Sequence, residues 1–305
     1  MSRNVCITAV EGQTGFLIAE LLLTDEDFKK KIDSLTGLTM NPSSDKVKEL
    51  KALGATIATH TPGRERDVAA ALKKTGCDTL CLVPPARADK LDIASELIGA
   101  ARRAGVANVL LISAAGCDYA ERDSQPRLRE FVDLEAAVLA CKGDPSNPLG
   151  HSPCVIRAGF YAENLLLYTE QARNEGLLPL PIGDKHKFAP IALGDISLVA
   201  AHVLTGKGAH GFDERHRGQL MVLTGPMLVS GEELAAAASK ALGQTLEFEN
   251  ISEREAKRVL KTQTDIDDSE KEYLLDYYSL HPTGPEEFFQ NYAGELRPKK
   301  KLRSG

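Results

Sequence analysis

The chain has 305 residues, 43% of them hydrophobic and 26% charged, with a formal net charge of −6. This composition is typical of a globular protein and excludes a largely disordered one, and the length allows one large α/β domain or a domain with a smaller partner. The acidic balance argues against nucleic acid as a direct partner. We interpret the C-terminal basic run Lys299–Arg303 as a solvated tail, because no basic helix accompanies it.

Cysteine usage and the start of the chain predict a cytoplasmic location. The six cysteines are scattered without a C-x-x-C pair, as in proteins of a reducing compartment. Residues Met1–Asn4 lead straight into an apolar run without a signal peptide, and no stretch approaches the roughly 18 apolar residues of a membrane span. We expect no metal, because His151, His186 and His210 lack the spacing of metal ligands.

In the first half, apolar runs of strand length alternate with stretches of helical period, which predicts βαβ units and a parallel sheet. The expected strands are Val5–Val10, Leu35–Met40, Ala55–Thr59, Thr79–Val83 and Val109–Ser113. The expected helices are Gly15–Leu23, Lys46–Leu53, Val68–Lys74 and Leu91–Arg103. Four right-handed crossovers in a row form an α/β, doubly wound parallel sheet, whose ligand lies at the carboxyl ends of the strands where the strand order reverses.

The second half is less regular and predicts a smaller mixed lobe. The expected helices are Arg127–Leu139, Ala162–Asn174, Asp195–Leu204, Gly231–Leu242, Glu253–Lys261, Ser269–Ser279 and Pro285–Tyr292. The other expected elements are strands Cys154–Arg157 and Leu220–Leu223, an extended stretch Phe188–Ile191 and a surface loop Asp144–Gly150. We divide the chain into a sheet domain, residues 1–153, and a mixed α/β lobe for substrate or partner, residues 154–305, which returns strands to the sheet.

The turn between the first strand and the first helix has the composition of a pyrophosphate cradle. It consists of Gly12, Gln13, Thr14 and Gly15, followed by Phe16. A glycine-rich turn that opens a helix directs unpaired N–H groups and the helix dipole at an anion, so the sheet domain is predicted to bind a dinucleotide. The third small residue of the full G-x-x-G-x-x-G spacing is Ile18 here, which we expect to push the helix outward. We also expect Gly15→Asp to abolish binding while leaving the fold intact.

The end of the second strand distinguishes the two dinucleotides. A carboxylate there accepts the ribose 2′-OH of NAD, and a basic residue pairs with the 2′-phosphate of NADP. No acid stands at the end of this strand. The groups that could hold a phosphate are Asn41, Ser43, Ser44 and Lys46, although the same turn would serve equally as a plain helix N-cap. We predict NADP, bound as NADPH, in preference to NAD.

Several segments together carry a family resemblance. They are the glycine loop, Met40–Lys46, Ala104–Val106 before Ile112-Ser113, and Arg157–Leu166 with the sequence Arg-Ala-Gly-Phe-Tyr-Ala-Glu-Asn-Leu-Leu. With Ala192–Ile196 and Leu223–Pro226, the likeness extends over roughly residues 4 to 250. This pattern resembles the NmrA-like family of atypical short-chain dehydrogenases. The resemblance implies a Rossmann fold with a small C-terminal lobe.

The resemblance also implies where the cofactor lies. Outside the glycine loop, the implied cofactor contacts are Met40, Val83, Pro84, Pro85, Ser113, Ala114 and Phe160. The segment Phe160–Asn164 would lie beside the nicotinamide, with Tyr161 and Asn164 facing the reactive ring. A buried ring and a helix-capping Asn would explain these two residues equally well.

The usual acid of a short-chain dehydrogenase is missing. In that class a Tyr-x-x-x-Lys pair lets the Tyr donate a proton, and no such pair follows the fifth strand. Related reductases carry a Lys four residues before a Glu in that helix, where this chain has Phe131 before Glu135. The remaining candidates are Tyr161 and Tyr119, although Tyr119 is more simply a surface loop aromatic. Cys117 has no identified His partner and is interpreted as structural.

Two functions are consistent with this pattern. The first, which we favour, is an NADPH-dependent reductase of a small conjugated, carbonyl, imine or quinone substrate, because an activated acceptor takes a hydride without a strong protein acid. The alternative is a non-catalytic redox sensor or regulator that binds a dinucleotide and acts through a protein partner. Three features favour this alternative: the Tyr-Lys pair is missing, Met40 stands where a basic residue is common, and Ile18 stands at the third small position of the glycine motif.

Overall fold

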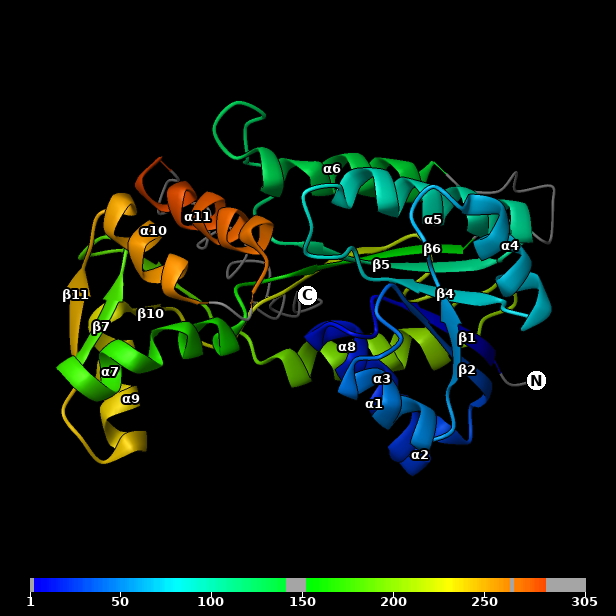
Figure 1. Cartoon of the computed structure of the whole chain (residues 1–305), viewed down its shortest axis with the longest axis horizontal. Helices are drawn as coiled ribbons and strands as arrows, with labels where there is room; N and C mark the ends of the chain where they lie inside the picture. Colours follow the sequence, from blue (N-terminus) through cyan, green and yellow to red (C-terminus); the bar gives the residue numbers. More distant parts are fainter. Residues whose placement is uncertain (1–2, 141–151, 264–265, 284–305) are drawn as a thin grey trace, which may run out of the picture.

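The computed structural model describes residues 3–140, 152–263 and 266–283, and a sheet of seven parallel strands crosses its centre (Figure 1). In the order of the sheet, the strands are β3 (Thr56–Thr59), β2 (Ile32–Thr39), β1 (Arg3–Thr8), β4 (Thr79–Leu82), β5 (Asn108–Ala114), β6 (Ser152–Ala158) and β9 (Leu220–Leu223). The strand order reverses between β1 and β4, which places the ligand crevice at their carboxyl ends. The predicted doubly wound sheet is confirmed.

Helices cover both faces of this sheet (Figure 1). On one face lie α4 (Glu65–Lys74), α5 (Lys90–Ala104) and α6 (Pro126–Leu139). On the other lie α1 (Gln13–Thr24), α3 (Asp45–Ala52) and α8 (Leu193–Thr205), with the short α2 (Glu26–Lys29) beside α1. Strands β4, β5 and β6 are buried at every residue, as expected for parallel strands that are covered on both sides.

The second half forms the predicted mixed lobe, at the left of Figure 1. Its elements are the 3₁₀ helix η1 (Ala162–Tyr168), α7 (Thr169–Glu175), β7 (Leu177–Leu180), β8 (Lys187–Phe188), β10 (Val229–Ser230), α9 (Gly231–Leu242), β11 (Glu247–Asn250), α10 (Glu253–Thr262) and α11 (Asp268–Thr283). Two small sheets, β10-β8 and β11-β7, support it. The division of the chain after residue 153 stays a prediction.

Several parts of the lobe differ from the sequence pattern. The helix expected from Ala162 begins as a 3₁₀ helix and becomes α-helical only at Thr169, because backbone hydrogen bonds between Ile191 and the residues flanking Tyr161 fix its start. Strands β7 and β11 are hidden in the sequence, since Pro179 interrupts one and a single apolar residue, Phe248, marks the other. The loop expected at Asp144–Gly150 and the helix expected at Pro285–Tyr292 lie outside the described residues.

Helix α11 joins the lobe to the sheet domain. Its Asp276 accepts hydrogen bonds from the backbone N–H groups of Arg127 (2.8 Å) and Leu128 (3.2 Å) and thereby caps α6 from outside the helix. The side chain of Arg127 pairs with Glu272 of α11 at 3.0 Å. These contacts hold the first turn of α11 over the carboxyl ends of the strands. Within the described ranges, no helix is long and apolar enough to cross a membrane.

Candidate functional site

The glycine loop brings α1 into direct contact with the end of β1 at Gly15. A Cβ atom added to Gly15 would lie 2.5 Å from the carbonyl oxygen of Ala9 and 2.7 Å from that of Thr8, closer than atoms can pack. The left-handed residue of the turn is Ala9, with φ 50°, whereas Gly12 has φ −81°. The need for glycine in this turn is therefore greatest at Gly15, and a side chain there should cost stability as well as binding, so that the effect of Gly15→Asp on the fold stays a prediction.

Ile18 does not hold α1 away from the sheet. Its side chain is fully buried in the core between α1 and the strands, because the close approach at Gly15 has already seated the helix. Gly12 is the N-cap of α1 and has no side chain to satisfy the N–H groups of the first turn. These donors and the helix dipole remain available to an anion, so the loop has the geometry of a pyrophosphate cradle.

Two buried hydrogen bonds join the ends of β1 and β4 at the crevice, where the strand order of the sheet reverses. The Thr8 hydroxyl donates to the carbonyl oxygen of Val83 and accepts from its N–H, both at 2.8 Å. This contact fixes the end of β1 against the end of β4. Pro84 and Pro85 follow directly, so the loop after β4 forms a stiff wall of the crevice.

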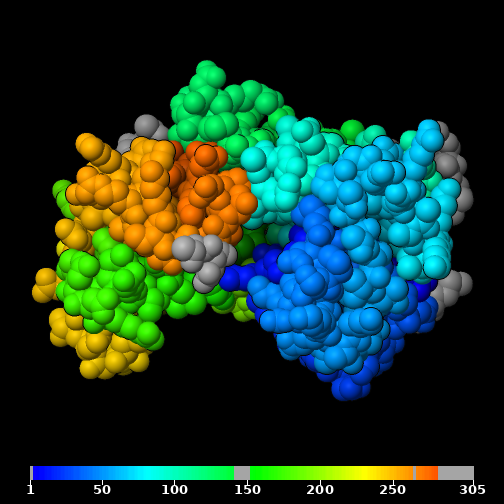
Figure 2. Space-filling view, in the orientation of Figure 1, coloured from blue at the N-terminus to red at the C-terminus, as the bar shows by residue number. Residues whose placement is uncertain are grey.

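A cavity of about 140 Å³ opens beside this wall. Figure 2 shows the surface hollowed between the lobe, in orange and green, and the sheet domain, in blue. The expected site residues that line the cavity are Thr14, Val83, Pro84, Pro85, Ser113, Ala114 and Tyr161. Among the other lining residues, five that carry a charge or a hydroxyl-bearing ring are not revealed by the sequence patterns: Arg87, Lys90, Arg127, Glu270 and Tyr273. These five belong to no motif, and the docking of α11 on α6 brings them together.

Lys90 supplies a buried ammonium group to the cavity. Its side chain is 7% exposed, and Nζ lies 3.1 Å from a Glu130 carboxylate oxygen and 4.2 Å from the centre of the Phe131 ring. Burial lowers the pKa of Lys90, and the nearby Glu130 opposes this only in part. This ammonium group reaches the ring of Phe131 on α6 from the neighbouring helix α5. Such a group is suited to donate a proton.

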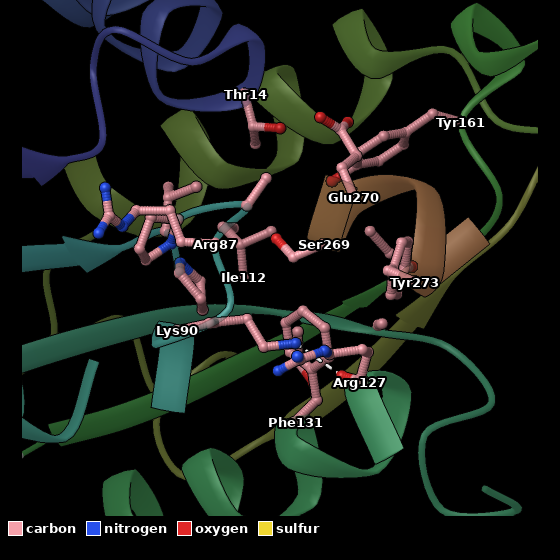
Figure 3. A pocket seen from close by; sticks show the side chains of 17 residues that line it. Thr14, Arg87, Lys90, Ile112, Arg127, Phe131, Tyr161, Ser269, Glu270 and Tyr273 are labelled. Atoms are coloured by element: carbon pink, nitrogen blue, oxygen red, sulfur yellow. Dashed lines mark hydrogen bonds between the residues drawn. The ribbon is translucent and has the colours of Figure 1, made fainter. Parts of the chain in front are cut away.

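Tyr161 and Glu270 point into the other end of the cavity, near Thr14 (Figure 3). Burial raises the pKa of Tyr161 to about 12, and a hydrogen bond with the Thr14 side chain opposes this in part. Tyr161 therefore keeps its proton at neutral pH and can donate a hydrogen bond. Glu270 lies in the first turn of α11, and burial raises the pKa of its carboxyl group.

A buried ion pair lies below the cavity. Arg157 of β6 makes two hydrogen bonds of 2.8 Å to the carboxylate of Glu135 on α6 and a third contact of 2.8 Å to Asp118. The Ser113 hydroxyl also donates to Glu135, at 2.6 Å. Burial raises the pKa of the Cys117 thiol to about 12, so this cysteine is not a reactive thiolate. The network links β5, β6 and α6, and it uses the Ser113 hydroxyl structurally.

The other residues expected near the nicotinamide have different surroundings. The Phe160 ring is buried in the lobe, with its centre 5.3 Å from that of Phe188. Asn164 lies in η1, where its backbone N–H donates to the Tyr161 carbonyl oxygen at 3.0 Å. Tyr119 is 47% exposed on the loop after β5. Contacts of these residues with a cofactor or substrate stay predictions.

The loop after β2 uses part of its expected phosphate-binding set internally. The Ser43 hydroxyl donates to the Asn41 side chain at 2.8 Å. The Ser44 hydroxyl accepts from the Val47 N–H at 3.3 Å and caps α3, as the plain N-cap interpretation predicts. Among the residues that the structure describes, no three His, Cys, Asp or Glu side chains gather as a metal site would require.

Comparison with known proteins shows similarity over most of the chain. The model of the NmrA-like family matches residues 1–285. The NAD(P)H azoreductase of Xenophilus azovorans is 28% identical over 273 residues, which cover 90% of this chain and 86% of the relative. Quinone oxidoreductase 2 of Escherichia coli (strain K12) is 25% identical over 259 residues, which cover 85% and 81%.

Solved structures share the fold. An NADPH-dependent quinone oxidoreductase from Escherichia coli, complexed with NADPH, superposes with a TM-score of 0.73 at 23% identity, over 95% of this chain and 94% of that one. The triphenylmethane reductase of Citrobacter sp., complexed with NADP(H), superposes with a TM-score of 0.72 at 18% identity, over 96% of both chains. At these identities the likeness establishes the Rossmann fold.

The contact at Gly15 predicts a stability effect that is independent of any cofactor. Gly15→Ala should lower the free energy of unfolding by about 2 kcal/mol, because the new methyl group meets two backbone carbonyl oxygens that cannot move aside cheaply. Gly194→Ala is the matched control, since a Cβ atom there meets nothing within 4 Å. Urea unfolding followed by circular dichroism measures both. Equal stability of the two variants would contradict the close approach.

The buried ion pair predicts a second stability effect. Glu135→Gln should cost about 3 kcal/mol of unfolding free energy, because it removes the more deeply buried of the two carboxylate charges that pair with the Arg157 guanidinium. Asp133→Asn, two residues earlier on α6, is the control; it breaks an exposed pair with Arg122 and should cost less than about 1 kcal/mol. Urea titrations of the two variants compare them directly. A smaller loss for Glu135→Gln than for Asp133→Asn would refute the role assigned to the network.

Proposed function

The chain belongs to the NmrA-like family, and on this premise we propose that it is an NAD(P)H-dependent reductase of a small conjugated acceptor, such as a quinone, imine, enone or other activated carbonyl compound. One observation carries the proposal. The cavity adjoins the glycine cradle at the carboxyl ends of the strands, and its apolar walls hold a buried ammonium group. The azoreductase and quinone oxidoreductase relatives support the same reaction class.

The residues fit a nicotinamide dinucleotide. The unpaired N–H groups of Gln13–Gly15 suit the pyrophosphate, and the wall Val83–Pro85 leads from there to the cavity floor at Ile112–Ala114. Tyr161 lies at the same end of the cavity as Thr14, which supports a role for it in orienting the nicotinamide ring. When bound, the cofactor supplies the hydride. Roles for Asn164 and Tyr119 rest on the resemblance and on loop position alone.

The protein's own contribution is to position the acceptor, exclude water and neutralise charge. Phe131, Tyr161 and Tyr273 offer aromatic faces to a planar conjugated molecule. An acceptor that takes a hydride develops negative charge on an oxygen or nitrogen atom. Lys90 is the buried cation of the cavity, and its lowered pKa favours proton release to that atom.

Binding and turnover test this proposal. We expect calorimetric titration to show binding of a reduced nicotinamide dinucleotide, and absorbance assays to show its oxidation by members of a panel of quinones, imines and enones. Tight binding without turnover by any of them would instead support the alternative, a dinucleotide-binding regulator that acts through a protein partner. Absence of binding by both NADH and NADPH would refute both functions.

The Lys90 ammonium predicts a kinetic effect with a pH signature. Lys90→Met keeps an apolar stem against Phe131 but removes the proton, so kcat should fall about 100-fold. In the wild type, activity should fall as the pH rises through the lowered pKa of Lys90, because only the protonated amine donates. This limb of the pH profile should be absent in Lys90→Met.

Lys74→Met, on the exposed side of α4, is the control for the loss of a positive charge. It should retain wild-type kcat and the wild-type pH profile. Unfolding curves of Lys90→Met separate a kinetic effect from a loss of folded protein, since Glu130 loses a partner in this variant. A folded Lys90→Met variant with unchanged kcat and pH profile would exclude Lys90 as the proton donor.

The choice between NADP and NAD depends on the end of β2. The predicted preference for NADP rests on Asn41, Ser43, Ser44 and Lys46, and the NADPH complexes of structural relatives support it. The structure adds a carboxylate, Glu11, to these groups at the same strand end. The cytoplasmic location and the absence of a nucleic-acid partner stay predictions.

A further inference from the structure

Glu11 belongs to the glycine loop, but its carboxylate lies at the end of β2. One oxygen, Oε1, accepts the backbone N–H of Met40 at 3.0 Å, and Met40 is the residue directly after β2. The other oxygen, Oε2, is buried and has no hydrogen-bond partner within the described part of the chain. A buried carboxylate oxygen without a donor is costly, so its environment is suited to a ligand that brings one.

The position of Glu11 Oε2 indicates which group of a ligand would donate a hydrogen bond to it. β1 and β2 are neighbours in register, and Thr8 pairs with Leu38, so the two strands end side by side. A small hollow beside Glu11 is lined by Met40, His60 and Pro85. In a sheet of this topology the adenosine ribose lies over the end of the second strand, where an acid accepts its 2′-hydroxyl group. Here the acid comes from the glycine loop instead of from the strand.

The surrounding groups do not favour a phosphate at this point. Met40 brings no charge, and the hydroxyl groups of Ser43 and Ser44 are already engaged within their own loop. His60 is buried against the carboxylate of Glu96 at 3.3 Å. On α3, Lys48 pairs with Asp45 at 2.7 Å, which leaves Lys46 as the cation of this turn that could face a phosphate.

We propose that Glu11 selects NADH over NADPH. Its Oε2 atom accepts the 2′-hydroxyl hydrogen of the adenosine ribose, and its negative charge repels a 2′-phosphate at the same position. The hydrogen bond from Met40 N–H holds the carboxylate in place for both effects. The inference rests on the proposed dinucleotide-dependent function, and it reverses the cofactor preference expected from the loop after β2.

The test compares dissociation constants for NADH and NADPH, measured by calorimetry on the full chain. The wild type should bind NADH at least about tenfold more tightly, the effect of one hydrogen bond to a charged group. Glu11→Gln keeps the acceptor oxygen for Met40 N–H but removes the charge, so the NADPH-to-NADH ratio of dissociation constants should fall about tenfold. Met40→Arg in the Glu11→Gln background should lower the dissociation constant for NADPH further.

Glu49→Gln, an exposed substitution on α3, is the matched control and should keep the wild-type ratio. The wild-type ratio is itself a test that requires no variant. Tighter wild-type binding of NADPH would overturn the selection by Glu11 and leave the reductase proposal standing. An unchanged ratio in a folded Glu11→Gln variant would also overturn it. Failure of both dinucleotides to bind would instead remove the proposed function on which the inference rests.

Discussion

The contact between α1 and the end of β1 is the constraint on which the other features depend. Because Gly15 has no Cβ atom, the first turn of α1 lies directly on the carbonyl groups of Thr8 and Ala9. The same approach places Ile18 in the core and aims the unpaired N–H groups of α1 at the crevice. The Thr8 hydroxyl then fixes Val83, the first residue of the cavity wall. The glycine loop, the cavity wall that begins at Val83 and the core around Ile18 therefore all depend on this one close backbone contact.

Charged groups around the cavity divide into structural and chemical sets. Below the cavity, Arg157 donates hydrogen bonds to the Glu135 carboxylate, which also accepts one from the Ser113 hydroxyl. These groups stabilise the structure, and we assign them no role in the reaction. Helix α6, which follows β5, carries no Tyr-x-x-x-Lys pair. An ammonium from α5 reaches the ring of Phe131 instead. In the proposed reaction, the proton donor therefore lies on α5.

The sequence predicts the parallel sheet well because its signals are local. Apolar runs mark the buried strands, and Gly105, with φ 77°, ends α5 where only a left-handed residue fits easily. The cavity's charged groups are not predictable in this way. Lys90 and Glu270 line one cavity because α11 packs on α6, where Asp276 accepts a hydrogen bond from the backbone N–H of Arg127, 149 residues away in the chain. The expectation that Ile18 pushes α1 outward fails for a related reason. It is based on the spacing of a sequence motif, whereas the distance between α1 and β1 depends on the close backbone contact at Gly15.

The ribose site shows the same difference between a position in sequence and a position in space. A search for an acid at the end of β2 finds Met40 and favours NADP, yet a carboxylate occupies that place because Glu11 reaches across from the neighbouring strand end. The N-terminus of α1 stabilises negative charge, both that of Glu11 and that of a pyrophosphate. In the proposed complex, a single loop binds the pyrophosphate through backbone donors and the ribose 2′-hydroxyl group through one acceptor, Glu11. A 2′-phosphate would add a second anion beside Glu11 without adding a donor to meet it.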